Sequence, residues 1–503
     1  MDSRKNYVVA VDVGSSEVVI AVGSMAEGGT VNIETVVAEP LTGVSAGLVE
    51  NSQTVAEALR RARVRAEQEV GVAITDAYVT ISGRFVRCAR YTDHVFVEDN
   101  ENRISQRDLA ALRERMLNVK AGAGEVIMDL FPLCYKSDIG TELQNPVGCY
   151  SKQLSSTYNF ILCEDTAKDR LRRVFLDLGI KIRSMFAGAS VMAKSLVTSD
   201  EKEDGVAIVD IGSGVTDLAI YRGGVLCYIA SIPMGGSALN NDILGYDNNI
   251  PSRMVENLKK QCGSAVVELT PDDMIQVRNR GRAIKPIPRL NLAAVIEARM
   301  TDIAEYVWNE IREAGYAKKL GAGIVLTGGG ANLKNVGELF HRITEQEVRV
   351  ACAEIGVATE ALEKYASPSY TMALSLLLHG AEVGPCPVGV LIQRPAEPKT
   401  EPKAEPAKPV EPAQPAKPAQ PKVTPQPQVT PQPQPQPQPI QQPAEPNTLK
   451  GEDDNYGDDI TDGDDDVKPG RGGWFRGWGG KIKRAFTEAF PEPGEDVDGD
   501  DEY

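Results

Sequence analysis

The chain has 503 residues, of which 42% are hydrophobic and 25% are charged, and its formal net charge at pH 7 is −17. This length leaves room for two to four domains, and the composition is that of a folded globular protein. The acidic balance argues against nucleic-acid binding. Eight cysteines without a CxxC pair and three isolated histidines predict reduced thiols, with neither a disulfide framework nor a metal cluster. No stretch approaches the roughly 18 apolar residues that cross a bilayer, so we expect a protein that stays in the cytosol.

Two stretches, one near the N-terminus and one near the middle of the chain, share a pattern. Residues 7–24, YVVAVDVGSSEVVIAVGS, and residues 205–224, GVAIVDIGSGVTDLAIYRGG, each pass from an apolar strand through Asp-x-Gly-Ser into a second apolar strand. Alternating β-branched residues on both sides of the turn predict a β-hairpin in each case. A dinucleotide-binding fingerprint would instead open a helix after its glycines. We expect the two hairpin turns to face each other.

These turns carry groups suited to a polyphosphate. Glycine lets backbone N–H groups approach an anion, hydroxyls add donors, and aspartates hold a hydrated Mg²⁺. The predicted phosphate-binding residues are Asp12, Gly14, Ser15, Ser16, Asp210, Gly212, Ser213, Gly214, Thr216 and Asp217. We expect the Mg²⁺ near Asp12 and Asp210, held through the nucleotide and not by a direct metal site. The alternative is two ordinary tight turns whose Asp and Gly serve turn geometry alone.

A third element lies at residues 322–343, AGIVLTGGGANLKNVGELFHRI. It has the pattern of a buried strand, three glycines and a helix. Gly328, Gly329 and Gly330 would let the backbone pass close to a flat ligand, and the following helix N-terminus suits a ribose and its phosphate. Three glycines after a strand are, by themselves, more often a structural turn. Together with the two hairpins, in this order, they predict a nucleotide site.

The composition changes near Arg394. Residues 395–449 are dominated by Pro, Gln, Ala and Lys, and an acidic run follows at 452–466, so we expect a disordered linker over 395–470. A second acidic segment, 491–503, ends the chain. After residue 394 there are 12 basic and 22 acidic residues, and 12 − 22 = −10. The body of the protein is therefore only mildly acidic.

Between the two acidic segments, residues 471–490 form a basic, aromatic stretch, RGGWFRGWGGKIKRAFTEAF. At 100° per residue its large apolar side chains fall on one side of a helix, with basic residues on the flanks and back. This pattern predicts an amphipathic helix that lies on an anionic membrane surface. The predicted membrane-binding residues are Trp474, Phe475, Trp478, Lys481, Ile482, Lys483, Arg484 and Phe486. The alternative is a helix that docks in the groove of a partner protein.

The segments DVGSS, DIGSGVTDLAIY and GIVLTGGGANLKNV resemble the phosphate-1, phosphate-2 and adenosine motifs of the actin, sugar-kinase and DnaK-chaperone superfamily. Within it, the chain is most similar to the FtsA family of bacterial cell-division proteins. It has GLVENSQTVAEAL, AYVTISGRFVRC, FPLCYKSDIGTELQNPVG, FAGASVMAKS and LAAVIEARMTDI at corresponding places. The resemblance implies an α/β protein with the actin-like two-domain ATPase fold, made of duplicated ribonuclease-H-like cores, with an FtsA-type inserted 1C subdomain.

The resemblance also implies a division of the chain into subdomains. The expected ranges are 6–83 and 163–195 for subdomain 1A, 84–162 for 1C, 196–229 and 301–385 for 2A, and 230–300 for 2B. Further nucleotide-binding residues follow from the same match. They are Gly235 and Gly236 in a second phosphate-side turn, Glu256 and Lys259 on a helix that contacts adenosine, and Gly328, Gly329, Gly330 and Asn332 in the adenosine motif. For Glu256 and Lys259 the alternative is a surface ion pair on a helix.

One residue departs from the family pattern. Many FtsA proteins carry a lysine just after the phosphate-1 turn, where this chain has Glu17. A carboxylate that faced the phosphates would repel them. Either Glu17 points elsewhere or the affinity for nucleotide is altered.

The resemblance implies an ATP- and Mg²⁺-binding protein that assembles into filaments. It would capture the C-terminal peptide of FtsZ on subdomain 2B, tether it to the inner face of the cytoplasmic membrane at the division site, and help recruit later division proteins. No catalytic residue that positions a water is identified, so we expect ATP hydrolysis that is slow at most.

Other functions of the same superfamily are weighed against this one. A soluble small-molecule kinase would need a catalytic carboxylate in a substrate cleft, and its C-terminal helix would bind a protein partner. A DnaK-like chaperone would need a β-rich peptide-binding domain where this chain has a Pro-Gln linker. MreB lacks the 1C-type insertion, and PilM lacks this C-terminal tail.

Overall fold

The computed structural model describes residues 6–25, 30–246, 250–279, 282–283, 286–358 and 363–390. The chain divides into two units, Met1–Gln393 and Arg394–Tyr503, and every described residue lies in the first unit. The linker, the amphipathic helix with its membrane-binding residues and the acidic tail therefore lie outside the described residues. Within the described part, no helix has the length and apolar character needed to cross a membrane.

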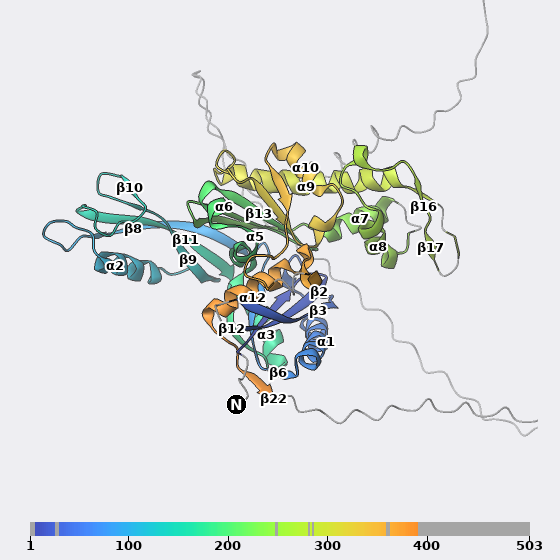
Figure 1. The fold of residues 1–503 in the computed structure, drawn as a ribbon, viewed down its shortest axis with the longest axis horizontal. Coiled ribbons are helices and arrows are strands. Elements are labelled where there is room, and N and C mark those ends of the chain that lie inside the picture. Colours follow the sequence, from blue (N-terminus) through green and yellow to red (C-terminus); the bar gives the residue numbers. More distant parts are fainter. Residues whose placement is uncertain are drawn as a thin grey trace, which may run out of the picture. The chain divides into compact units, whose positions relative to one another are not determined.

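The first lobe is built on a five-stranded sheet with the order β12-β7-β1-β2-β3. The strands are β1 (Tyr7–Val13), β2 (Glu17–Met25), β3 (Val31–Pro40), β7 (Asp76–Ile81) and β12 (Lys181–Ala187). The first three are antiparallel, whereas β7 is parallel to β1 and to β12. Helices α1 (Ser52–Val70) and α3 (Asp165–Asp177) cover one face, and α12 (Thr371–Val383) covers the other (Figure 1). Because both faces are covered, the inner strands are apolar on both sides.

The second lobe repeats this plan. Its sheet has the order β15-β14-β13-β20-β21. The strands are β13 (Val206–Ile211), β14 (Thr216–Arg222), β15 (Val225–Ile232), β20 (Ile324–Thr327) and β21 (Val348–Val350). Three antiparallel strands are again followed by two parallel ones. Both predicted hairpins are confirmed, as is the two-domain α/β fold with duplicated cores.

Helices also flank the second sheet. Helix α9 (Arg289–Glu313) and α10 (Val336–Thr344) pack together, with α7 (Gly236–Tyr246) and α8 (Ser252–Cys262) beside them (Figure 1). The short helices α4 (Gly188–Val191), α5 (Ala193–Leu196) and α6 (Ser199–Asp204) lead from β12 into β13. The predicted division at residues 300 and 301 falls inside α9, which is one continuous helix. The subdomain boundaries themselves stay a prediction.

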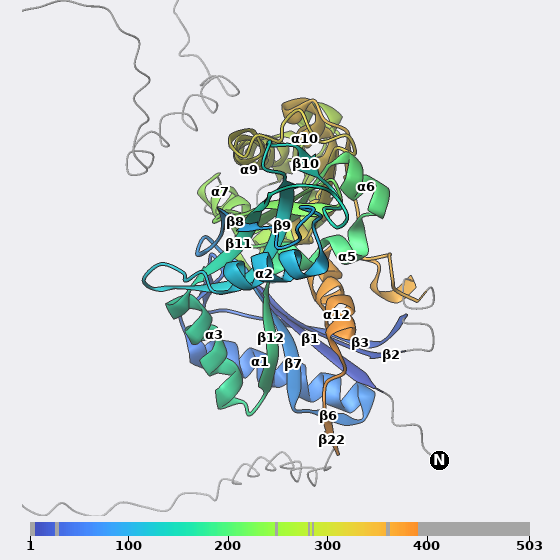
Figure 2. The ribbon, with the colours of Figure 1, turned by 90° about the vertical axis from the view of Figure 1, so that its left-hand side faces the viewer.

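A separate four-stranded sheet is inserted between β7 and α3 of the first lobe. It has the order β10-β9-β11-β8, with β8 (Val86–Phe96), β9 (Glu125–Lys136), β10 (Glu142–Leu143) and β11 (Gln153–Glu164). Helix α2 (Gln106–Leu117) packs on it (Figure 2). The insert also reaches the second lobe, because the Asn159 amide donates to the carbonyl of Cys227 at 3.0 Å and Arg90 donates to the Tyr316 hydroxyl at 3.2 Å.

The remaining described elements are short. They are the hairpin of β4 (Val44–Ser45) and β5 (Leu48–Val49), the strands β16 (Met274–Ile275), β17 (Arg278–Asn279), β18 (Arg282–Ala283) and β19 (Ile287–Pro288), and the 3₁₀ turns η1 (Val267–Leu269), η2 (Gly329–Asn332) and η3 (Pro368–Tyr370). Strand β22 (Val388–Val390) pairs with β6 (Val72–Ile74) of the first lobe. The described chain therefore ends on the first lobe.

Candidate functional site

A cavity of about 450 Å³ lies between the two lobes, at the ends of β1 and β13. It is lined by the β1–β2 turn, the β13–β14 turn, the first residue of α7, one side of α8 and the loop after β20. Among its lining residues are Asp12, Gly14, Ser15, Ser16, Asp210, Gly212, Ser213, Gly236, Glu256, Lys259, Gly328, Gly329, Gly330 and Asn332. The structure thus brings together all but four of the residues predicted to bind nucleotide.

The two hairpin turns meet directly. Each is closed by a backbone hydrogen bond, from Gly14 N–H to the Glu17 carbonyl at 3.0 Å in the first turn and from Gly212 N–H to the Val215 carbonyl at 2.9 Å in the second. A Cβ atom on Gly214 would collide with the side chain of Ser15. Glycine is therefore required at the point where the second turn touches the first.

A second loop supports the β13–β14 turn from the side of α7. The Gly236 N–H donates to the Gly212 carbonyl at 2.9 Å, and the Ser237 N–H donates to the Ser213 carbonyl at 2.8 Å. A Cβ atom on Gly235 would collide with the backbone of this turn. Gly235 therefore lies behind the turn, and the N-terminus of α7 points its positive dipole end toward the cavity.

The three glycines after β20 pass closely over the end of β13. Gly328 has φ of +84°, and a Cβ atom there would collide with the Asp210 carboxylate. At Gly330 a Cβ atom would collide with the side chain of Ile211. Gly328 and Gly330 are therefore needed for the close approach of the loop, which places Asn332 at the cavity wall with its amide 3.1 Å from the Ser369 hydroxyl.

Three carboxylates cluster behind and beside the turns. The Asp12 carboxylate accepts a hydrogen bond from Thr80 at 2.6 Å, and Asp217 accepts one from Ser231. Burial raises the pKa of Asp12 to about 6, a shift that the Thr80 bond opposes and the charge of Asp217 increases. Burial likewise raises the pKa of Asp217 to about 6. The pKa of Asp210 is raised well above its usual value by burial and by the charges of Asp217 and Asp12.

This carboxylate cluster suits a hydrated cation better than a directly bound one. In the described ranges, no three acidic, histidine or cysteine side chains are arranged to hold a metal ion. Asp12 and Asp210 reach the cavity wall, where they can accept hydrogen bonds from the waters of a Mg²⁺. The Ser15 hydroxyl, which also reaches the wall, is buried and has no hydrogen-bond partner in the described structure. A polyphosphate with its Mg²⁺ would give the Ser15 hydroxyl a hydrogen-bond acceptor and would balance the charge of the Asp12 and Asp210 carboxylates.

Helix α8 brings an ion-pair cluster to the cavity. The Glu256 carboxylate lies 2.8 Å from Lys259 Nζ and 3.2 Å from Lys260 Nζ. Lys259 also donates to the Gly236 carbonyl at 2.9 Å, and only 12% of its side chain is exposed. Burial lowers the pKa of Lys259, and the charge of Glu256 opposes that shift. The predicted pair is therefore part of the cavity wall and not an isolated surface pair.

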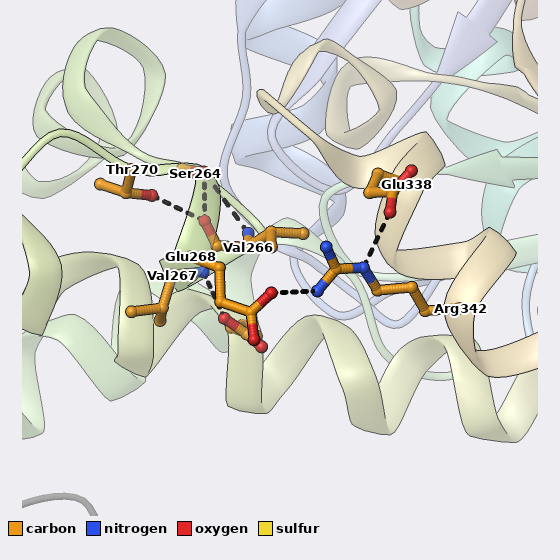
Figure 3. A network of polar contacts seen from close by, with 8 residues as sticks. Ser264, Val266, Val267, Glu268, Thr270, Glu338 and Arg342 are labelled. Carbon is orange, nitrogen blue, oxygen red and sulfur yellow. Dashed lines mark hydrogen bonds and ion pairs between the residues drawn. The ribbon is translucent and has the colours of Figure 1, made fainter.

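The loop that follows α8 is fixed to the rest of the second lobe by the polar network in Figure 3. Within the loop, Thr270 donates to the Val266 carbonyl at 2.7 Å, and the Val267 N–H donates to Glu297 of α9 at 2.5 Å. Arg342 of α10 donates to Glu268 at 3.0 Å and to Glu338 at 2.8 Å. This network ties the loop that follows α8 to α9 and α10.

The four predicted residues that do not line the cavity are Gly214, Thr216, Asp217 and Gly235. Thr216 is fully buried and donates to the Met234 carbonyl at 2.8 Å, so it braces the α7 loop. The cavity also includes residues that the sequence did not indicate, among them Lys260, Ser367, Ser369 and Met372. Lys260 could have been predicted only from its position next to Lys259. Ser367, Ser369 and Met372 lie in a segment that is far in sequence from the three glycine-rich motifs and carries no motif of its own.

The duplicated sheets and the cleft between them define a class, the two-lobed α/β proteins with the actin-like ATPase fold. A solved structure of the PilM–PilN type IV pilus biogenesis complex agrees with this class. It has a TM-score of 0.50 and 15% identity, and the match covers 74% of this chain and 98% of the other.

Sequence comparisons relate the chain to one family of this class. The family model described as "Cell division protein FtsA" matches residues 207–375. Cell division protein FtsA of Escherichia coli strain K12 is 29% identical over 388 residues, which are 75% of this chain and 91% of that protein. Cell division protein FtsA of Bacillus subtilis strain 168 is 28% identical over 354 residues, which are 70% and 79% of the two chains. The chain is therefore similar to the FtsA family, over residues 207–375 for the family model and over most of its length for these relatives.

Replacing Asp210 by Asn should stabilise the protein in the absence of nucleotide and divalent cation. Because its pKa is raised in the folded state, native Asp210 keeps its proton at pH values where the unfolded chain, with a pKa of about 4, has lost it. The stability contributed by this group therefore falls as pH rises above about 4. We expect Asp210→Asn to unfold at a higher temperature than the wild type at pH 7.5, and its unfolding temperature to fall less between pH 5 and pH 7.5.

Thermal unfolding of the full chain in EDTA measures this effect. Asp93→Asn is the matched control, because the Arg115 guanidinium lowers the pKa of Asp93 and its removal should not stabilise the protein at neutral pH. If the unfolding temperature of Asp210→Asn depended on pH as that of the wild type does, the carboxylate cluster would not lower folding stability as proposed.

Proposed function

We propose that this chain is an actin-like, ATP-binding cell-division protein that forms filaments and tethers FtsZ to the membrane. The single observation that supports nucleotide binding best is the convergence of two glycine-rich turns and a glycine loop on one cavity between the lobes. The relatives named above are cell division proteins, which supports the cellular role. The nucleotide would place its phosphates at the two turns and its adenosine between α8 and the glycine loop.

Within this proposal the residues have distinct tasks. The N–H groups and hydroxyls of the turns bind phosphate oxygens, and the free Ser15 hydroxyl gains a partner. Asp12 and Asp210 orient the waters of Mg²⁺, which supplies the positive charge that neutralises the phosphates. Glu256 and Lys259 face the ribose side of the cavity. No residue is assigned as a catalytic base, so we propose hydrolysis that is slow at most.

Full-length protein should bind ATP in a Mg²⁺-dependent way. Asp12→Asn removes one of the two carboxylates that orient the cation, so we expect its affinity for ATP in Mg²⁺ to fall at least about tenfold, with little change in EDTA. Isothermal titration calorimetry measures both conditions, with Asp93→Asn as the control. If wild type and Asp12→Asn bound ATP equally tightly in Mg²⁺, Asp12 would not orient the cation as proposed.

The membrane role rests on residues 471–490, outside the described residues. Four large apolar side chains on one helical face, each contributing about 1.5–3 kcal/mol when fully buried, favour a reversible interfacial anchor. Gly479 and Gly480 each cost about 1 kcal/mol of helix stability, so the helix would order on binding. Assembly into filaments would then add avidity at the cytoplasmic face of the membrane.

Flotation with anionic liposomes in Mg-ATP tests the anchor. The full chain should float, whereas a chain ended at Gly470 and the double variant Trp478→Glu, Phe486→Glu should stay in solution, because they lack the apolar face. If all three stayed in solution, residues 471–490 would be a protein-binding peptide, and the soluble-kinase alternative would gain support.

Subdomain 2B is proposed to bind the C-terminal peptide of FtsZ. Among the described residues of this region, two large apolar side chains are exposed, Leu269 at 52% and Met274 at 53%. Leu269 lies within the loop that the network of Figure 3 fixes, and Met274 follows that loop, so the two would form a pre-organised apolar contact. Later division proteins and neighbouring copies of the chain would use other surfaces.

Met274→Glu should weaken binding of a synthetic FtsZ C-terminal peptide to the full chain by at least about fivefold, because a charge replaces an apolar contact. Leu176→Glu, on α3 of the first lobe, is the matched control, since Leu176 is equally exposed at 58%. Fluorescence anisotropy of a labelled peptide measures both. An equal loss in the two variants, or none in Met274→Glu, would place the peptide elsewhere.

A further inference from the structure

The wall of the cavity contains a carboxylate that no phosphate site requires. Glu17 is the first residue of β2, directly after the first hairpin turn, and its side chain lines the cavity. Within the described ranges its carboxylate accepts no hydrogen bond and forms no ion pair within 4.0 Å. Burial raises the pKa of Glu17, and the charge of Glu256 adds to that shift while Lys260 opposes it. A carboxyl group therefore lines the same cavity that the phosphates of a nucleotide would enter.

The positive charge around the cavity comes from one helix. Of the described residues that line it, Lys259 and Lys260 are the cations, and both are on α8 of the second lobe. Lys259 is fixed by two contacts, to Glu256 and to the Gly236 carbonyl. Lys260 has one contact, to Glu256 at 3.2 Å, and 67% of its side chain is exposed. Lys260 is thus the cation that is free to turn toward another anion.

Glu17 and Glu256 approach Lys260 from opposite lobes. Glu256 is on the same helix as Lys260, whereas Glu17 comes from the first lobe, across the cavity. A lysine on a flexible stem exchanges partners easily, because its charge has no fixed direction. A polyphosphate in the cavity would compete with both carboxylates for Lys260, and Glu17 would in addition repel it.

We propose that Glu17 is a specificity-determining residue that competes with the nucleotide phosphates for Lys260 and so penalises ATP more than ADP. This inference rests on the proposed nucleotide binding and goes beyond it, because it assigns the selection between nucleotides to one cross-cleft pair of side chains. The penalty grows with the charge of the ligand, since each added phosphate adds negative charge near the same carboxylate. ATP then binds less tightly than the turns alone would permit.

The test is isothermal titration calorimetry of the full chain with ATP and with ADP in Mg²⁺, without lipid. Glu17→Gln keeps the size of the side chain and removes its charge. We expect it to bind ATP at least about fivefold more tightly than wild type, and ADP by a smaller factor. Glu39→Gln is the matched control. Glu39 is on the neighbouring strand β3, pairs with Arg61 and Arg65 outside the cavity, and should leave both affinities unchanged.

A double-mutant cycle tests the competition for Lys260 separately from simple repulsion. Lys260→Gln should weaken ATP binding, and in that background Glu17→Gln should give a smaller gain than in the wild type. Equal gains in the two backgrounds would overturn the competition. Unchanged or weaker ATP binding by Glu17→Gln, or an equal change for ATP and ADP, would overturn the specificity role. If wild type bound neither nucleotide, the proposed function would fail, and this inference with it.

Discussion

The site depends on the close approach of two hairpin turns, one from each lobe. Gly214 touches the side chain of Ser15, Gly235 lies against the backbone of the second turn, and Gly328 passes over Asp210. Each contact excludes a Cβ atom, so the glycines follow from the geometry of the cleft and not from local turn preference alone. Backbone N–H groups and hydroxyls of both turns thereby line one cavity, where the proposed polyphosphate would reach both.

This geometry has an electrostatic cost. The ends of β1 and β13 bring the partly buried Asp12 close to the buried Asp210 and Asp217, and the pKa values of all three are raised. Positive charge at the cavity is supplied by α8, and the network of Figure 3 ties the loop that follows α8 to α9 and α10. A cation and a ligand that join the lobes would relieve the repulsion, so folding stability and ligand binding are linked through the same carboxylates.

The parts of the fold that are local in sequence were predictable. The alternating strands around Gly14 and Gly212, and the strand, glycine and helix pattern around Gly328, carry their own periodicity. Tertiary contacts were not predictable in this way. Nothing near Ser367 or Ser369 in sequence indicates the cavity, and the direction of Glu17 is set by the register of β2 against its neighbours. The sequence also did not show that one helix, α9, runs across the predicted boundary at residue 300.

The central claim is that one nucleotide is bound by both lobes at once. Hydrogen–deuterium exchange of the full chain, with Mg²⁺ alone and with Mg-ATP, tests it most directly. The account predicts that ATP protects backbone amides of both hairpin turns, residues 13–17 and 211–216, together with the loop at 328–333. Protection of one lobe only, or no protection in either turn, would contradict it.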